Sequence, residues 1–273
     1  MPDSPPSSGP GVPGPLSIGA TVRTALALYR ADAARLWGAI ALVVVPTQAL
    51  VLGLRLISIP SGAVLRNAAV VVRAGQTGTF TGVSTVAAVL SALMLLVSIG
   101  AAYRIILGRY LDHPADLRTS FSFALDRAFG LVWVSILVAA CVLVGFLLFI
   151  LPGIYFIVAL SVAVPVLMTE GGRGARALAR SQELVAGAWF HVLGCLLVAA
   201  VLGGLGEGLL QLLLTSLTRA LTPGSIPGFL LIGGALTSLV AVLLAPFSAA
   251  VSTVIYVDML VRKHDPYLPQ LLA

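Results

Sequence analysis

Six long apolar blocks dominate the sequence and limit what the chain can fold into. They cover approximately residues 37–56, 84–107, 130–150, 153–169, 189–216 and 229–257. A helix of about 20 apolar residues crosses a hydrocarbon layer of about 30 Å, and only the fourth block is a little short. Charged residues make up 10% of the chain, against about 25% in soluble domains. The sequence therefore predicts an all-α, polytopic integral membrane protein with six transmembrane helices.

Basic residues next to the blocks predict the orientation, because Lys and Arg near the ends of spans are retained in the cytoplasm. With the N-terminus inside, the inner ends carry Arg23, Arg30, Arg35, Arg104, Arg109, Arg118, Arg127, Arg173, Arg176, Arg180, Arg262 and Lys263. The outer ends carry only Arg55, Arg66, Arg73 and Arg219. We therefore expect a multi-pass protein of the cell membrane with both termini in the cytoplasm.

Three tryptophans mark repeated units within the chain. Trp37, Trp133 and Trp189 each stand at the start of an odd-numbered span, where indole favours the headgroup boundary. Each follows a moderately polar stretch with helical spacing of its apolar residues. These stretches cover residues 18–35, 115–128 and 173–187. The pattern predicts three copies of one unit, a cytoplasmic interfacial amphipathic helix followed by a transmembrane hairpin, with the three tryptophans at one level.

The segments outside the spans include two expected tails and one longer outer loop. Residues 1–15 are mainly Pro, Gly and Ser and are expected to form a disordered cytoplasmic tail, followed by one transmembrane domain over residues 16–265. Residues 266–273 are expected to form a second short tail, and residues 64–72 an outer interfacial helix. Between the third and fourth spans, Leu151-Pro152-Gly153 predicts a tight reversal.

Charged residues gather near the inner ends of the even-numbered spans. The candidate cluster comprises Arg104, Glu170, Arg180, Asp258 and Arg262. In a bundle of three hairpins these ends converge, so the charges are expected to pair with one another, with hydroxyls from Tyr103 and Tyr256. Binding of lipid headgroups is the second interpretation of the same residues.

At the outer side, the repeat places two charges near one level. A helix that continues 18 residues beyond a tryptophan, at about 1.5 Å per residue, travels about 27 Å. This step leads from Trp37 to Arg55 and from Trp189 to Glu207. A structural pair between Arg55 and Glu207, or a Glu207 that simply reaches water, is one interpretation, and a transport or proton role of Glu207 is the other.

Motifs for chemistry are missing from the sequence. His113, His191 and His264 lie in three segments without paired ligand spacing, so no metal site or cofactor is predicted. Cys141 and Cys195 lie inside apolar blocks as packing residues. No nucleophile motif such as Gly-x-Ser-x-Gly is present, so we assign no catalytic residue and expect no enzyme activity. Nucleic-acid binding is excluded, because the basic residues flank apolar blocks instead of forming a stripe.

A series of short motifs carries a family resemblance. The motifs are Ala27-Leu28-Tyr29-Arg30, Pro152-Gly153-Ile154-Tyr155, Pro165, Glu170-Gly171, Ala177-Leu178-x-Arg180-Ser181, Leu184, Gly187, Trp189, Pro246-Phe247 and Tyr256-x-Asp258-x-x-x-Arg262. In this order they resemble the membrane domain associated with glycerophosphoryl diester phosphodiesterases, a bacterial and archaeal family. The resemblance implies that, in some members of the family, this membrane domain is an anchor fused to a phosphodiesterase catalytic domain. Because 15 residues follow Asp258, we expect a stand-alone membrane domain without phosphodiesterase activity.

The combined pattern predicts a non-catalytic membrane module that organises lipids or partner proteins in envelope or phospholipid metabolism. Its expected partners are anionic lipid headgroups on the cytoplasmic side, and protein partners or further copies of the chain. A small transporter or permease is the alternative, and a lipid-modifying intramembrane enzyme the third. A mid-bilayer pocket at Gln48, Gln211 or Glu207 would favour transport, converging inner charges beside a groove would favour lipid binding, and a solidly packed bundle would favour a scaffold.

Overall fold

The computed structural model describes residues 14–57, 78–110, 117–171, 174–222 and 226–267. Within these ranges the chain is almost entirely helical and contains no strand, as the apolar blocks predict. The helices are α1 (Ile18–Ala31), α2 (Ala33–Ile57), α4 (Gly78–Tyr110), α5 (Leu117–Asp126), α6 (Ala128–Leu148), α7 (Ile150–Ala159), α8 (Ala163–Glu170), α9 (Ala175–Val185), α10 (Trp189–Leu221) and α11 (Ile226–Arg262). Most of the expected N-terminal tail, the expected outer helix over residues 64–72 and the last six residues lie outside the described ranges.

Six segments of the described chain are long and apolar enough to cross a membrane. They are Ala33–Val51, Leu93–Tyr110, Ala128–Leu148, Ile150–Glu170, Trp189–Leu221 and Val242–Arg262. Large apolar side chains stay exposed along α6 and α10; Leu147 and Leu212, for example, are 84% and 65% exposed. Such a surface is suited to lipid, because hydrocarbon does not penalise exposed apolar groups as water does. The chain is a multi-pass membrane protein.

Each of the three helical hairpins follows a shorter helix, as the repeat predicts. In chain order, α1 precedes α2 and α4, α5 precedes α6 and the pair α7–α8, and α9 precedes α10 and α11. The short helices are amphipathic: α1 buries Thr21, Val22 and Ala25, while Arg23 and Arg30 on the same helix are exposed.

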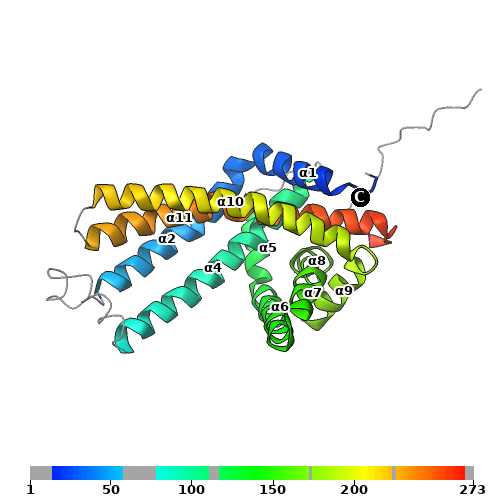
Figure 1. The fold of residues 1–273 in the computed structure, drawn as a ribbon, viewed down its shortest axis with the longest axis horizontal. Helices are drawn as coiled ribbons and strands as arrows, with labels where there is room; N and C mark the ends of the chain where they lie inside the picture. Colours follow the sequence, from blue (N-terminus) through cyan, green and yellow to red (C-terminus); the bar gives the residue numbers. More distant parts are fainter. Residues whose placement is uncertain (1–13, 58–77, 111–116, 172–173, 223–225, 268–273) are drawn as a thin grey trace, which may run out of the picture.

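The hairpins do not run parallel to one another. In Figure 1, α10 and α11 lie side by side along the long axis, α2 and α4 diverge from them, and α6 and α7 are seen almost end-on. The last part of α11 is enclosed by other parts of the chain, because every residue from Thr253 to Val261 is buried. A helix that is enclosed on all sides can hold polar groups only where they find partners.

The first helix runs lengthwise along α11. The backbone N–H of Leu16 donates to Asp258 near the end of α11, and the hydroxyl of Tyr29 donates to the carbonyl of Leu243 near its middle. This carbonyl lies one turn before Pro246, whose missing N–H disturbs the hydrogen bonds of the preceding turn. In a helix the N–H at position 246 would serve the carbonyl of Val242, so the Tyr29 hydroxyl donates to the carbonyl next to the one that the proline deprives of its donor.

The position of α1 corrects the prediction of a common tryptophan level. Trp37 donates to the Tyr29 hydroxyl beside Leu243, whereas His191, two residues after Trp189, lies 3.3 Å from Arg262 at the end of α11. The two positions are separated along α11 by roughly 19 residues, or about 28 Å of helix. The prediction is wrong for Trp37, because α1 carries the chain along α11 before α2 begins.

The reversal between α6 and α7 occurs at Phe149, whose backbone is extended, and not at Leu151-Pro152-Gly153 as expected. Pro152 instead lies in the first turn of α7, where no intrahelical bond needs its N–H. Gly153 allows close packing of the hairpin, because a Cβ there would lie 2.5 Å from the ring of Phe146. The fourth span is broken after Ala159 and resumes as α8 at Ala163, two residues before Pro165.

Candidate functional site

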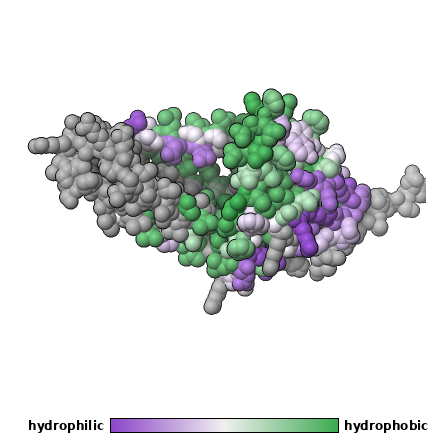
Figure 2. Space-filling view, turned by 90° about the horizontal axis from the view of Figure 1, so that it is seen from below, coloured by the Kyte–Doolittle hydropathy of each residue, from purple (hydrophilic) through white to green (hydrophobic). Residues whose placement is uncertain are grey.

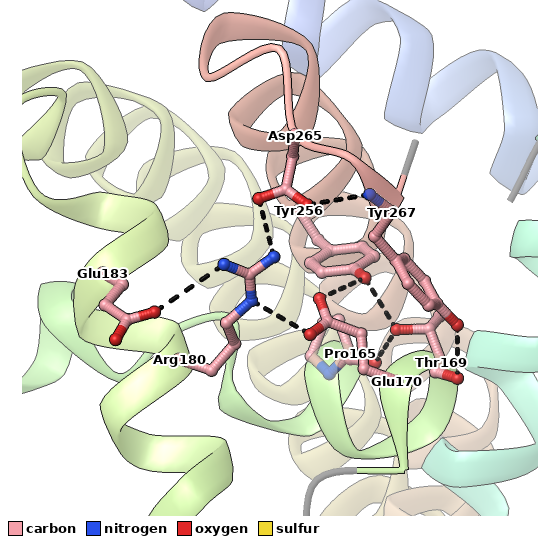
Figure 3. A network of polar contacts seen from close by, with 8 residues as sticks. All are labelled: Pro165, Thr169, Glu170, Arg180, Glu183, Tyr256, Asp265 and Tyr267. Atoms are coloured by element: carbon pink, nitrogen blue, oxygen red, sulfur yellow. Dashed lines mark hydrogen bonds and ion pairs between the residues drawn. The ribbon is translucent and has the colours of Figure 1, made fainter. Parts of the chain in front are cut away.

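The carboxylate of Glu170 lies at the junction of two helices and the end of a third. Glu170 is the last residue of α8, and Gly171 follows in the left-handed conformation with φ 70° that ends the helix. From the neighbouring helix α9, Arg180 points toward this carboxylate, and Tyr256 reaches it from α11 (Figure 3). Two consecutive helices, α8 and α9, therefore meet the distant helix α11 at one acidic side chain.

Arg180 holds two carboxylates at once (Figure 3). Its Nε donates to Glu170 Oε2 at 3.0 Å, and its Nη2 donates to Asp265 Oδ2 at 2.7 Å. Glu183, one turn further along α9, lies 3.7 Å from Nη1 but is 68% exposed. Burial disfavours the charge on Arg180, yet the hydrogen bonds and charges of Asp265 and Glu170 outweigh it and raise the pKa of the guanidinium.

Hydroxyl groups complete this network. Tyr256 donates to Glu170 Oε1 at 2.9 Å and lies 2.8 Å from the hydroxyl of Thr169, which donates to the carbonyl of Pro165. Tyr267 donates to the carbonyl of Thr169 at 2.8 Å, so the segment after α11 is tied to the end of α8. The predicted hydroxyl contribution of Tyr256 is thereby confirmed.

A second network surrounds Asp258, whose side chain is 1% exposed. Its carboxylate accepts from the Leu16 backbone N–H at 2.7 Å and from Arg262 Nε at 2.8 Å, and His191 Nε2 lies 3.1 Å away. Arg262 also donates through Nη2 to the carbonyl of Leu16. Asp258 and Arg262 thus bind the backbone N–H and carbonyl of Leu16, and they join the start of α1 to the start of α10 and the end of α11.

Arg104 belongs to a third group. Its guanidinium lies 4.0 Å from the centre of the Phe123 ring, and Arg127 lies 4.1 Å from the same ring. Arg127 further donates to the carbonyls of Leu167 and Met168 in the last turn of α8. The five candidate residues therefore contact one another as two pairs, Glu170 with Arg180 and Asp258 with Arg262, and Arg104 is held separately.

The predicted outer pair is described only in part. The side chain of Arg55 lies outside the described residues, so its pairing with Glu207 stays a prediction. Glu207 is exposed on α10 and has no hydrogen bond or ion pair with any side chain that the structure describes. Gly204 and Gly208 beside it have open space where a Cβ would be.

Several members of the two networks carry no signal in the sequence. Asp265 lies just past α11, and His191 lacks a neighbour with ligand spacing, so only the fold brings them to Arg180 and Asp258. The position of Asp265, a few residues after a long apolar span, is the one sign in the sequence that points to it. Among the described side chains, no group of three His, Cys, Asp or Glu is placed to hold a metal ion. Comparison with protein-family models, curated proteins and solved structures finds no match to this chain.

Proposed function

We propose that this chain is a non-catalytic membrane module that organises anionic lipid around a rigid, charged end. The observation that carries the proposal is the use of the charged residues: Glu170, Asp258 and Asp265 each accept hydrogen bonds from an arginine. Carboxylates that are committed to arginines hold helices together and are poorly suited to exchange protons with a substrate. We infer a structural task for these ions.

Basic side chains at the same end support a lipid partner. Arg176 on α9 and Lys263 and His264 after α11 are exposed, close to the ends of apolar helices. Figure 2 agrees: hydrophobic residues cover the middle of the face shown, and hydrophilic residues gather toward the end at which α11 finishes. Lys and Arg at such positions attract anionic headgroups of the cytoplasmic leaflet. In this proposal both termini are cytoplasmic, and the protein lies in a bacterial cell membrane.

The resemblance to the membrane domain of glycerophosphoryl diester phosphodiesterases is part of the same proposal. Several of its motif residues, among them Pro165, Glu170 and Arg180, take part in the network at the end of α8. A shared structural core is enough to account for those motifs. We propose a role in envelope or phospholipid metabolism on this association alone.

Transport remains the second candidate because of Glu207, an ionisable residue within the span Trp189–Leu221. Glu207 and Gln211 are both exposed on α10, and Gln48 on α2 is half-buried. Residues that point away from the packed helices do not line a path between them, which favours the lipid-organising role.

Lipid preference tests the proposal directly. The full chain, purified in mild detergent, is titrated with phosphatidylglycerol and with phosphatidylcholine, and bound lipid is counted by native mass spectrometry. We expect the anionic lipid to bind about tenfold more tightly, since each basic residue near an anionic surface contributes about 1 kcal/mol. Equal binding of both lipids would refute the proposal, and a substrate gradient across proteoliposomes that depends on Glu207 would support transport instead.

A further inference from the structure

A groove lies at the charged end, between the α9–α10 connection and the end of α11. Its volume is about 740 Å³, within the range of about 300–1,000 Å³ for small-molecule sites. Its lining residues are Gly14, Pro15, Leu184, Ala186, Gly187, Ala188, Met259, Val261, Arg262, Lys263 and His264. One part of the lining is apolar, and three consecutive basic or imidazole side chains form the other.

The basic part of the groove has hydrogen-bonding capacity to spare. Arg262 uses Nε and Nη2 for Asp258 and Leu16, and Nη1 makes no hydrogen bond within the described ranges. Lys263 donates one of its three N–H groups to the carbonyl of Glu183. Because Asp258 already neutralises Arg262, Lys263 supplies the surplus positive charge of the groove.

The start of α10 adds a further attraction for anions. Ala188 is the N-cap of this 33-residue helix, and no side chain accepts from its first N–H groups. Unpaired N–H groups at the positive end of a helix dipole favour an anion, and Gly187 and Ala188 place this helix start in the lining of the groove. The indole N–H of Trp189, the first residue of α10, is buried without a partner among the described residues.

His264 occupies a backbone position that glycine normally takes. Its φ is 48°, and its N–H and that of Asp265 close the end of α11 onto the carbonyls of Val261 and Leu260 at 3.1 Å. A side chain in this left-handed conformation carries a conformational cost that glycine would avoid. In this conformation, His264 lines the groove next to Lys263.

We propose that this groove binds the phosphate group of an anionic glycerophospholipid. The phosphate lies against Lys263, His264 and the start of α10, while the glycerol and the first acyl carbons follow Ala186, Ala188 and Val261. An aromatic residue at the helix start, Trp189, is typical of the headgroup boundary at which such a lipid resides. The inference rests on the proposed function and gives it a defined site.

The test uses variants of the full chain in the phosphatidylglycerol titration. Lys263→Gln removes the surplus charge, and we expect a loss of affinity of about fivefold, as one basic residue contributes near an anionic surface. His264→Gly suits the φ of 48°, so it removes the imidazole while the helix end keeps its conformation, and we expect a further loss. Lys263→Arg should retain binding.

Arg219→Gln is the matched control, because Arg219 is exposed in the last turn of α10, the opposite end of that helix, and its loss lowers the net charge equally. If Arg219→Gln and Lys263→Gln weaken binding equally while the wild-type chain keeps its anionic preference, the groove is wrong and the proposed function survives. If the wild-type chain shows no preference, the proposed function itself fails. Competition by glycerol phosphate at equal concentration would identify a soluble phosphate ester as the ligand and overturn the lipid assignment.

Discussion

Arg180 on α9 and Asp265 beyond the end of α11 form an ion pair of 2.7 Å although 85 residues separate them in the sequence. Glu170 closes the pair into a bridge, so the second and third hairpins are joined through one guanidinium. Neither hairpin can shift at this end without separating charges that are largely shielded from water. The stability of the charged end therefore depends on Arg180.

Removing one acid from this bridge should destabilise the protein. Glu170→Gln leaves Arg180 with one buried partner and weakens the acceptor of the Tyr256 hydroxyl. We expect a loss of about 2 kcal/mol, less than for a fully buried pair, since the side chains are 16% and 27% exposed. The measurement is the thermal unfolding midpoint in detergent. Glu183→Gln is the control, because Glu183 is 68% exposed and its loss should change stability by less than about 0.5 kcal/mol; equal effects of the two changes would contradict the bridge.

At the tip of the α6–α7 hairpin, any side chain at residue 153 should destabilise the protein. Gly153→Ala adds a Cβ at 2.5 Å from the Phe146 ring, and relieving that overlap should cost about 1–3 kcal/mol. Gly38→Ala on α2, where nothing lies within 4 Å, should be neutral or slightly stabilising. Adding Phe146→Ala to Gly153→Ala should restore part of the lost stability. No difference between the two glycine variants would show that the hairpin packs differently.

The Tyr29 hydroxyl should contribute more than an ordinary surface hydroxyl. It donates to Leu243 at 2.6 Å and accepts from the Trp37 indole at 3.0 Å, so Tyr29→Phe breaks both contacts. We expect a loss of about 1–2 kcal/mol and a change in tryptophan fluorescence, because the indole loses its acceptor. Tyr155→Phe provides the comparison, since Tyr155 is 49% exposed on α7. Identical midpoints for both variants would argue against the contact between α1 and α11.

Cysteine labelling can establish the orientation of the spans. With Cys141 and Cys195 replaced by Ala, single cysteines are introduced at exposed Arg176 on α9 or Arg219 at the end of α10. The distribution of basic residues predicts that an impermeant maleimide labels Arg219→Cys in intact cells and Arg176→Cys only after permeabilisation. The reverse pattern would place both termini outside.

The sequence was sufficient to predict which segments form helices, but not how these helices are oriented against one another. Apolar blocks of about 20 residues predict spans because lipid leaves the backbone few alternatives, and the amphipathic stretches before Trp37, Trp133 and Trp189 correctly predict the helix that precedes each hairpin. That α1 lies along α11 follows from contacts such as Tyr29 with Leu243, which no periodic pattern contains. Because α1 lies along α11, Trp37 is also separated from the level of Trp189.

The sequence predicted which charged residues form the candidate site better than it predicted which of them pair. Charges at helix ends inside a membrane protein need partners, so Glu170, Arg180, Asp258 and Arg262 were correctly expected to form ion pairs. Which arginine serves which acid depends on the crossing of α9 and α11, and Asp265 enters only because α11 ends in a turn at His264. The prediction that the chain reverses at Pro152-Gly153 was wrong for a local reason, because proline fits the first turn of a helix as well as a loop.

The hydrogen bond from the Leu16 N–H to Asp258 has a consequence for biosynthesis. The two residues are 242 positions apart, so a growing chain presents α1 to the membrane insertion machinery long before its acceptor has been made. Until α11 is synthesised, Leu16 before the first helix lacks its acceptor Asp258, and the earlier hairpins lack the helix against which they pack. Assembly of the charged end must therefore be a late event that the final helix completes, and a chain stalled before Asp258 should be a substrate for membrane quality control.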